Sequence, residues 1–120
     1  MFEHPEKKSL NDREMFNDIV NAILSVMGDD VVKIILYGSV ARGDNTWESD
    51  VDIAVLTTRY YDWSAKEEMY DNLWEYDLKY DTIFSIIPIH ETTFNELKSE
   101  KLFYQNILKD GIVLWTKNAA

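Results

Sequence analysis

Apolar residues recur at helical spacing between Ser9 and Met27, and this pattern predicts a first amphipathic helix. The apolar positions of this stretch are Met15, Phe16, Ile19, Val20, Ile23, Leu24 and Met27. Ser9 or Asn11 is expected to cap the start of the helix, because a short polar side chain accepts a hydrogen bond from the unpaired amides there. Gly28 is expected to end it, since glycine adopts the left-handed conformation without steric cost.

Two later helices are indicated by a hydroxyl residue that is followed three positions later by glutamate, which is the capping-box pattern. The pairs are Ser64 with Glu67 and Thr93 with Glu96. The helix that begins near Ser64 is expected to run to about Leu78. A further helix is expected to begin at Ser99 and to end at Gly111.

Runs of Val, Ile and other apolar residues with polar boundaries predict four strands. These strands cover residues 31–37, 50–57, 81–89 and 112–115. Pro88 indicates that the third strand ends there or lies at an edge of the sheet, because proline lacks the amide hydrogen that a central strand uses. Helices and strands alternate along the chain, so the sequence predicts an α/β (α+β) fold in which helices pack on a small mixed β-sheet.

The composition is that of one globular domain, with 120 residues of which 46% are hydrophobic and 28% are charged. We expect residues 9–116 to form this domain, residues 1–8 to be a flexible N-terminus and residues 117–120 to be a tail. The chain has no cysteine, which excludes disulfides, thiolate metal sites and cysteine nucleophiles. No signal peptide and no apolar stretch of roughly 20 residues is present, so a cytoplasmic protein without membrane association is expected.

The net charge of −10 bears on the kind of partner. Proteins that bind nucleic acid without sequence preference use Lys and Arg to neutralise phosphates, so stable binding of DNA or RNA is not expected. A basic partner protein fits this charge, as does a small substrate whose charge a metal ion offsets. The acidity is equally compatible with a role in solubility alone.

A glycine–serine turn, Gly38-Ser39, follows the first predicted strand. Glycine lets the backbone approach a ligand closely, and the amides at a helix start donate hydrogen bonds to anionic oxygen. A short helix is expected from Ser39 to about Asp44, so this turn is a candidate phosphate cradle. Arg42 in the same segment either contacts a phosphate or pairs with nearby acids, and the sequence leaves both interpretations open.

Asp50 and Asp52 begin the second predicted strand. Because side chains alternate across a strand, the two carboxylates point to the same face while Val51 and Ile53 are buried behind them. Carboxylates this close repel each other unless a proton or a cation lies between them. Aspartate is also disfavoured in strands, so a solvated strand start is the weaker interpretation. The pair predicts a Mg²⁺ site, since Mg²⁺ is held by one or two carboxylates together with substrate phosphates.

A third acid is expected near the pair, because a hydroxyl nucleophile needs a base or a further metal ligand. Asp81 is the preferred candidate, since it begins the third predicted strand among apolar residues. Asp77 is the competitor, but it lies near the end of a predicted helix, where an acid is usually solvated. The sequence therefore favours Asp81 as the third catalytic and metal-binding carboxylate.

Aromatic residues are concentrated after the second predicted strand. We expect one of Tyr60, Tyr61 and Trp63 to pack on the domain and the others to form an interaction surface for a partner. Further along, Tyr70, Trp74 and Tyr80 occur at helical spacing and are expected in the core. His4 and His90 have no neighbouring residues that indicate catalysis.

The run Gly38-Ser39-Val40-Ala41-Arg42-Gly43-Asp44, followed by Ser49-Asp50-Val51-Asp52, resembles the motif of the nucleotidyltransferase superfamily that includes DNA polymerase beta and kanamycin nucleotidyltransferase. The small size of the chain points to the minimal branch, the MNT-domain proteins, and the resemblance covers about residues 12–116. It implies a nucleotidyltransferase fold. It also implies that Gly38 and Ser39 hold a triphosphate, that Asp50 and Asp52 bind Mg²⁺ and that Asp81 completes the triad. The implied reaction moves AMP from ATP, or a nucleotide from another NTP, to a hydroxyl.

Minimal members of this family are often paired with a helical HEPN-domain protein, and in such pairs the MNT protein is the antitoxin that adenylylates a tyrosine of its partner. The resemblance therefore implies a protein adenylyltransferase with a HEPN-type toxin as its partner. A binding antitoxin that uses no catalysis is an alternative. A nucleotidyltransferase that modifies a small molecule of the antibiotic type is another.

Overall fold

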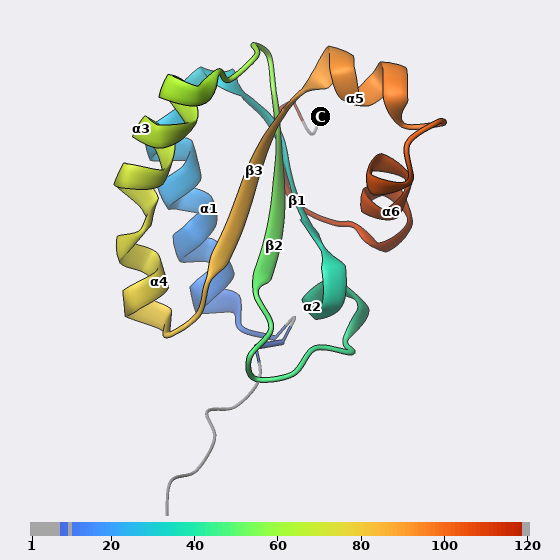
Figure 1. Ribbon diagram of the computed structural model, residues 1–120. Helices are drawn as coiled ribbons and strands as arrows, with labels where there is room; N and C mark the ends of the chain where they lie inside the picture. Colours follow the sequence, from blue (N-terminus) through green and yellow to red (C-terminus); the bar gives the residue numbers. More distant parts are fainter. Residues whose placement is uncertain (1–7, 10, 119–120) are drawn as a thin grey trace, which may run out of the picture.

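A mixed sheet of four strands forms the centre of the molecule (Figure 1). The computed structural model describes residues 8, 9 and 11–118. Its elements are α1 (Arg13–Met27), a 3-10 turn (Gly28–Asp30), β1 (Val31–Tyr37), α2 (Gly38–Arg42), β2 (Val51–Thr57), α3 (Trp63–Leu73), α4 (Glu75–Tyr80), β3 (Phe84–His90), α5 (Glu91–Leu97), α6 (Leu102–Asp110) and β4 (Ile112–Thr116). The strand order is β3-β2-β1-β4, in which β1 is antiparallel to β2 and β4 while β2 is parallel to β3. The predicted fold class is therefore confirmed.

Helices cover both faces of this sheet. Figure 1 shows α1, α3 and α4 on one side of the strands and α2, α5 and α6 on the other. The larger core cluster lies under α1 and α3, and the sheet contributes Ile34, Leu36, Val51, Ile53, Val55 and Ile86 to it. The smaller cluster lies on the opposite face and includes Ile35, Ala54, Leu56, Ile89, Phe94 and Ile107. Alternation along β1 and β2 thus divides the apolar side chains between two helical layers.

The strand predictions hold most closely in the centre of the sheet. β1 has the predicted bounds, β2 begins one residue later than predicted, and β4 extends one residue further. β3 begins only at Phe84, so the prediction that Asp81 opens this strand is wrong. Asp81 instead ends α4 with a left-handed backbone at φ 49°. β3 lies at the edge of the sheet, which confirms the interpretation of Pro88.

The starts of α1 and α3 differ from the prediction, and only α3 has a side-chain cap at its start. Asp12, rather than Ser9 or Asn11, precedes α1. Gly28 ends that helix as predicted, with a positive φ of 60°, but its ψ of −138° lies outside the predicted left-handed helical region. The side chain of Asp62 accepts a hydrogen bond from the amide of Ala65, so α3 begins before the predicted cap at Ser64. A turn at residue 74 divides the expected single helix into α3 and α4.

The last two helices are also displaced from their predicted starts. α5 begins directly after His90, earlier than the predicted cap at Thr93, and α6 begins after Lys101, later than Ser99. The predicted flexible residues 1–7 and the tail residues 119–120 lie outside the described residues. Within the part of the chain that is described, no helix has the length and apolar character needed to cross a membrane.

Candidate active site

The end of β1 and the start of β2 bring Gly38 against Asp52. Tyr37 and Asp52 are direct partners in the antiparallel register, and the chain turns into α2 immediately after Tyr37. Gly38 has φ 77°, a conformation that side-chain-bearing residues rarely adopt. A Cβ atom at this position would also overlap Oδ2 of Asp52 and lie 3.2 Å from its Cγ. The glycine is therefore required both by the turn and by the close approach of the carboxylate.

Asp52 lies on the sheet face opposite to the larger core cluster. Val51 and Ile53, its neighbours in β2, are fully buried in that cluster, as the alternation predicts. In the parallel pairing of β2 and β3, Asp52 is opposite Ser85. The carboxylate is thus flanked by Tyr37 on one side and by Ser85 on the other.

The surroundings of Asp52 disfavour its charged form. Burial is the main cause of its raised pKa, the negative charge of Asp50 adds to the shift, and the positive charge of Arg42 opposes it. Among the described residues, no hydrogen-bond donor contacts the Asp52 carboxylate. This half-buried carboxylate receives no hydrogen bond and lies close to a second carboxylate. The pair therefore offers oxygen ligands and excess negative charge, both of which suit a divalent cation.

Tyr37 forms a wall of this site that the sequence analysis did not identify. Burial, and then the nearby charge of Asp52, raise the pKa of Tyr37 to about 12, so its phenol is neutral at physiological pH. Its ring packs edge-to-face on Phe103 of α6, with 5.9 Å between the ring centroids. Its position directly before Gly38 is visible in the sequence, but its pairing with Asp52 depends on the strand register.

Arg42 forms ion pairs with two acidic residues. Its Nε atom lies 3.1 Å from Oδ2 of Asp44, and its Nη1 atom lies 3.3 Å from Oδ2 of Asp110 in α6. These contacts raise the pKa of Arg42, with the hydrogen bond to Asp44 as the largest cause. Of the two interpretations left open, ion pairing is therefore present, and its acidic partners are not the aspartates of the predicted metal site.

Asp50 and Asp81 lie at the rim of one cavity of about 470 Å³, together with Asp77, Leu78 and Ile83. Asp81 is exposed and precedes β3, so it is not next to Asp52 in the sheet. Within residues 8, 9 and 11–118, no group of three or more acids or histidines is arranged to hold a metal ion. The structure thus associates Asp50 with Asp52 electrostatically, while the catalytic role of Asp81 stays a prediction.

Asp77 has a structural role that the sequence analysis did not anticipate. Its Oδ1 atom accepts a hydrogen bond from the amide of Phe84 at 3.0 Å. Its backbone carbonyl accepts from the amides of Asp81 and Thr82. These three bonds connect the end of α4 to the start of β3, so Asp77 is not simply a solvated acid.

The aromatic residues singled out in the sequence differ in their exposure. Tyr61 is buried, whereas Tyr60 and Trp63 are 69% and 76% exposed, which confirms the prediction that one of the three packs on the domain. The core assignment of Tyr70 and Trp74 is wrong, because both are exposed. Tyr80 does pack against the core, as predicted, and the stripe of α3 and α4 that faces the core also includes Met69, Leu73 and Tyr76.

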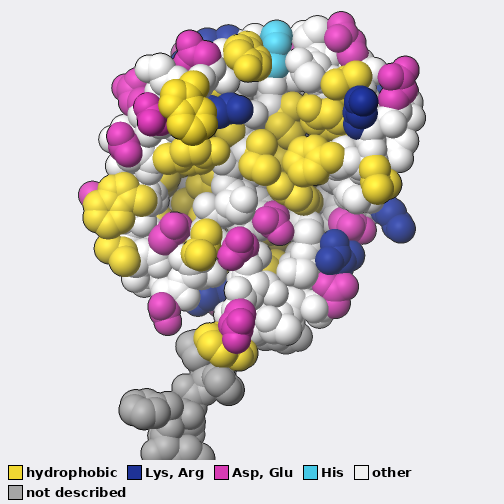
Figure 2. All heavy atoms as spheres, in the orientation of Figure 1, with side chains coloured by type: hydrophobic (Ala, Val, Ile, Leu, Met, Phe, Trp, Pro, Cys, Tyr) yellow, Lys and Arg dark blue, Asp and Glu magenta, His cyan; other side chains and the backbone are white. Residues whose placement is uncertain are grey.

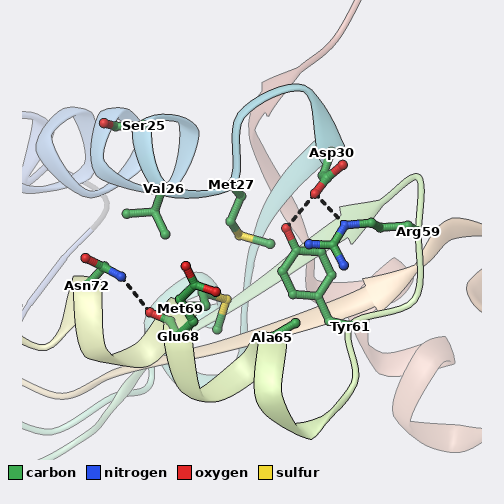
Figure 3. Close-up of a pocket in the computed structure, with 10 residues that line it drawn as sticks. All are labelled: Ser25, Val26, Met27, Asp30, Arg59, Tyr61, Ala65, Glu68, Met69 and Asn72. Atoms are coloured by element: carbon green, nitrogen blue, oxygen red, sulfur yellow. Dashed lines mark hydrogen bonds and ion pairs between the residues drawn. The ribbon is translucent and has the colours of Figure 1, made fainter.

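A second cavity, of about 400 Å³, lies at the opposite end of the sheet between α1 and α3 (Figure 3). Oδ2 of Asp30 accepts hydrogen bonds there from Nε of Arg59 at 2.8 Å and from the hydroxyl of Tyr61 at 2.9 Å. The guanidinium of Arg59 also lies 4.2 Å from the ring centroid of Tyr61. These groups satisfy one another, so the cluster holds the loop after β2 in place.

Comparison with known proteins identifies the family to which the chain belongs. The profile of the family described as "Polymerase beta, Nucleotidyltransferase" matches residues 20–120. A candidate protein adenylyltransferase of Methanocaldococcus jannaschii is 35% identical over 106 residues, which are 88% of this chain and 100% of the relative. The chain belongs to the polymerase beta nucleotidyltransferase family. Members of this superfamily generally use a divalent metal.

Solved structures of this nucleotidyltransferase fold include antitoxins. A mutant of the MntA–HpeT toxin–antitoxin superposes with a TM-score of 0.60 at 26% identity, over 92% of this chain and 76% of that chain. The MNT antitoxin in complex with the tri-AMPylated HEPN toxin of Shewanella oneidensis gives a TM-score of 0.57 at 20% identity, over 88% of this chain and 72% of that chain. The predicted minimal nucleotidyltransferase fold is thus confirmed.

Proposed function

We propose that this nucleotidyltransferase transfers AMP from ATP to a hydroxyl of a partner protein, most specifically a tyrosine of a HEPN-type toxin. The observation that carries the proposal is the Asp52 carboxylate, which is half-buried beside Gly38 and, among the described residues, has no hydrogen-bond donor. The charged form of this carboxylate is disfavoured, as its raised pKa indicates, and a bound cation would relieve this. Membership of the family and the relative named as a candidate protein adenylyltransferase support the same activity.

Asp50 and Asp52 are the residues that would hold Mg²⁺. Their oxygen atoms are the ligands that this cation prefers. Burial, and then the charge of Asp50, raise the pKa of Asp52, and a bound cation would offset both by favouring the ionised carboxylate. When bound, the metal supplies charge neutralisation at the phosphates of the nucleotide. Gly38 and Ser39 begin α2, where backbone amides would donate to the triphosphate, and the missing side chain of Gly38 keeps the phosphates close to Asp52.

The reaction joins the acceptor oxygen to the α-phosphorus of ATP. The bond from this phosphorus to the bridging oxygen breaks, pyrophosphate leaves, and the hydroxyl proton of the acceptor passes to a base or to solvent. Asp81 is the base proposed from the family pattern, although it lies at the cavity rim with Asp50 and not in the sheet. Arg42 would contact a phosphate only by leaving its partners Asp44 and Asp110.

The similar proteins and the net charge of the chain support a protein as the acceptor of AMP. A structural neighbour at 26% identity is a toxin–antitoxin protein, and the Methanocaldococcus relative is named for protein modification. The net charge of −10 favours a partner with a basic surface. A binding antitoxin without catalysis would use the same surface but would have no need of a metal-ready carboxylate pair.

Mass spectrometry of the partner tests the proposal directly. The protein would be incubated with ATP, Mg²⁺ and a HEPN-type toxin, and we expect the toxin to gain one or more AMP groups on tyrosine. Asp52→Asn should abolish the gain, whereas Asp29→Asn, which changes an exposed acid at the other end of the sheet, should not. An unmodified partner that is still neutralised by Asp52→Asn would favour the binding antitoxin.

A further inference from the structure

A ridge of large apolar side chains lies on the outer surface of α3 and α4. Tyr70, Trp74 and Leu78 occur at four-residue spacing, and the backbone of Trp74 keeps helical angles between the two helices. Ile83 continues this row toward the start of β3. Trp74, Leu78 and Ile83 are 54%, 72% and 58% exposed. These four residues are called the α3–α4 ridge below.

The fold does not need this ridge for its own core. The helices pack on the sheet through the stripe of Met69, Leu73, Tyr76 and Tyr80, one position away along the helix. Figure 2 shows hydrophobic side chains standing at the surface over α3 and α4, with acidic side chains between them. An exposed row that contains two aromatic residues is typical of a protein contact surface.

The ridge leads into the candidate active site. A hollow of about 180 Å³ separates Tyr70 and Trp74 from the edge strand, where Phe84 lines it. Leu78 and Ile83 then line the neighbouring cavity that also contains Asp50. A molecule that lies along the ridge would therefore reach the predicted metal site at one of its ends.

The ridge is surrounded by negative charge. The acids of residues 67–81 are Glu67, Glu68, Asp71, Glu75, Asp77 and Asp81. The nearby basic residues are Lys66, one turn before Tyr70, and Lys79, which forms an ion pair with Asp18 of α1, so that the acids outnumber the bases around the ridge. An apolar row with an acidic border is complementary to a helix that has one apolar face and basic flanks.

We propose that the α3–α4 ridge docks a basic amphipathic helix of the protein that receives AMP. This inference rests on the proposed function for the identity of the partner. The three helical positions span about 12 Å, which corresponds to two turns of an approaching helix. The partner's apolar face occupies the hollow beside β3, and its Lys and Arg side chains lie against the acidic border.

The position of the ridge distinguishes it from the other exposed aromatic pair, Tyr60 and Trp63. That pair follows the far end of β2. Thr57, the last residue of this strand, is already about 17 Å from Asp52 along the strand, and the pair comes after it. A contact at Tyr60 and Trp63 adds affinity without presenting a side chain to Asp50 and Asp52. The ridge adds affinity and also directs the acceptor to the carboxylates.

Binding measurements on five variants test the ridge, namely Trp74→Ala, Leu78→Ala, Glu75→Lys, Val113→Ala and Trp63→Ala. Isothermal titration of the HEPN-type protein should show affinity about 30-fold weaker for Trp74→Ala and clearly weaker for Leu78→Ala, because an aromatic anchor is lost. Val113→Ala, which truncates a 52% exposed side chain on the opposite edge strand β4, is the matched control and should bind as the wild type does. Glu75→Lys should weaken binding and reduce its salt dependence.

The outcomes separate this inference from the proposed function. Wild-type affinity in both Trp74→Ala and Leu78→Ala would overturn the ridge, even if the partner is adenylylated. A loss of binding confined to Trp63→Ala would also overturn it. Weaker binding in the ridge variants without any AMP transfer by the wild type would support the ridge and refute the enzymatic function. If the wild-type protein does not bind this partner, both proposals fail.

Discussion

Two aspartates at opposite ends of the sheet have opposite electrostatic surroundings. Asp30, just before β1, receives hydrogen bonds from Arg59 and Tyr61, and these lower its pKa although burial by itself raises it (Figure 3). Asp52, at the start of β2, has a raised pKa, mainly because it is partly buried and also because Asp50 is close, and within the described residues no donor contacts it. The protein stabilises the charge of one carboxylate and leaves the charge of the other uncompensated.

The difference indicates which end of the sheet is prepared for a ligand. A lowered pKa means that the ionised form of Asp30 stabilises the folded state, whereas a raised pKa means that ionised Asp52 opposes folding. The charge of Asp30 is already stabilised by Arg59 and Tyr61 without any ligand. The Asp52 site becomes favourable only when a cation is added, as the proposed reaction requires.

The largest effect is expected from Asp52→Asn. Transfer of AMP should fall at least about 100-fold, because the charge stabilisation supplied by a metal is worth several kcal/mol. The melting temperature of the ligand-free protein should rise slightly at pH 7, since an uncompensated charge has been removed. Mass spectrometry of the partner measures the loss of AMP transfer, and melting curves of the protein with and without Mg²⁺ and ATP measure the rise in melting temperature. A variant that keeps the full ligand-induced shift would refute the assignment.

Gly38→Ala should have the next largest effect, on folding as well as on activity. The new Cβ atom meets Asp52 and also forces a side-chain-bearing residue to adopt a positive φ, so we expect a loss of about 2–4 kcal/mol in unfolding free energy. Gly43→Ala is the matched control. It has φ 82° but no atom within 4 Å of its Cβ position, and it should lose only about 1 kcal/mol in urea unfolding.

Asp81→Asn tests the third carboxylate. If Asp81 is the base, turnover should fall at least about tenfold while the thermal shift caused by ATP and Mg²⁺ is retained. Asp77→Ala should instead destabilise the fold by about 1–2 kcal/mol, because the amide of Phe84 loses its acceptor. Normal turnover in Asp81→Asn would exclude Asp81 as the base.

The smallest effect is expected from substitution of Asp30, whose carboxylate already has hydrogen-bond partners. Asp30→Asn should lower the unfolding free energy by about 1 kcal/mol at pH 7 and leave AMP transfer unchanged. Since the pKa of Asp30 is lowered in the folded state, this deficit should persist down to about pH 4 and vanish below it. The advantage of Asp52→Asn should begin to shrink as the pH falls through the raised pKa of Asp52 and should be gone below about pH 4, whereas the deficit of Asp30→Asn begins to shrink only there, so denaturation across pH distinguishes the two aspartates.

The sequence predicted a feature correctly where the feature depends on one short segment of the chain. The apolar run of β1, the alternation of Val51 and Ile53 around Asp52 and the stop at Gly28 were all readable, because each depends on residues adjacent in sequence. The helix starts were harder, since several polar residues compete for one set of amides. Asp62 displaced Ser64 for this reason.

The sequence by itself determined the fold class, the glycine–serine turn and the aspartate pair, because strand alternation and glycine geometry follow from the backbone alone. Only the tertiary structure decided what surrounds them. The register of β2 with β1 and β3 places Tyr37 and Ser85 beside Asp52, while the left-handed turn at Asp81 keeps that acid out of the sheet. These contacts join segments far apart in the chain, and no local periodicity encodes them.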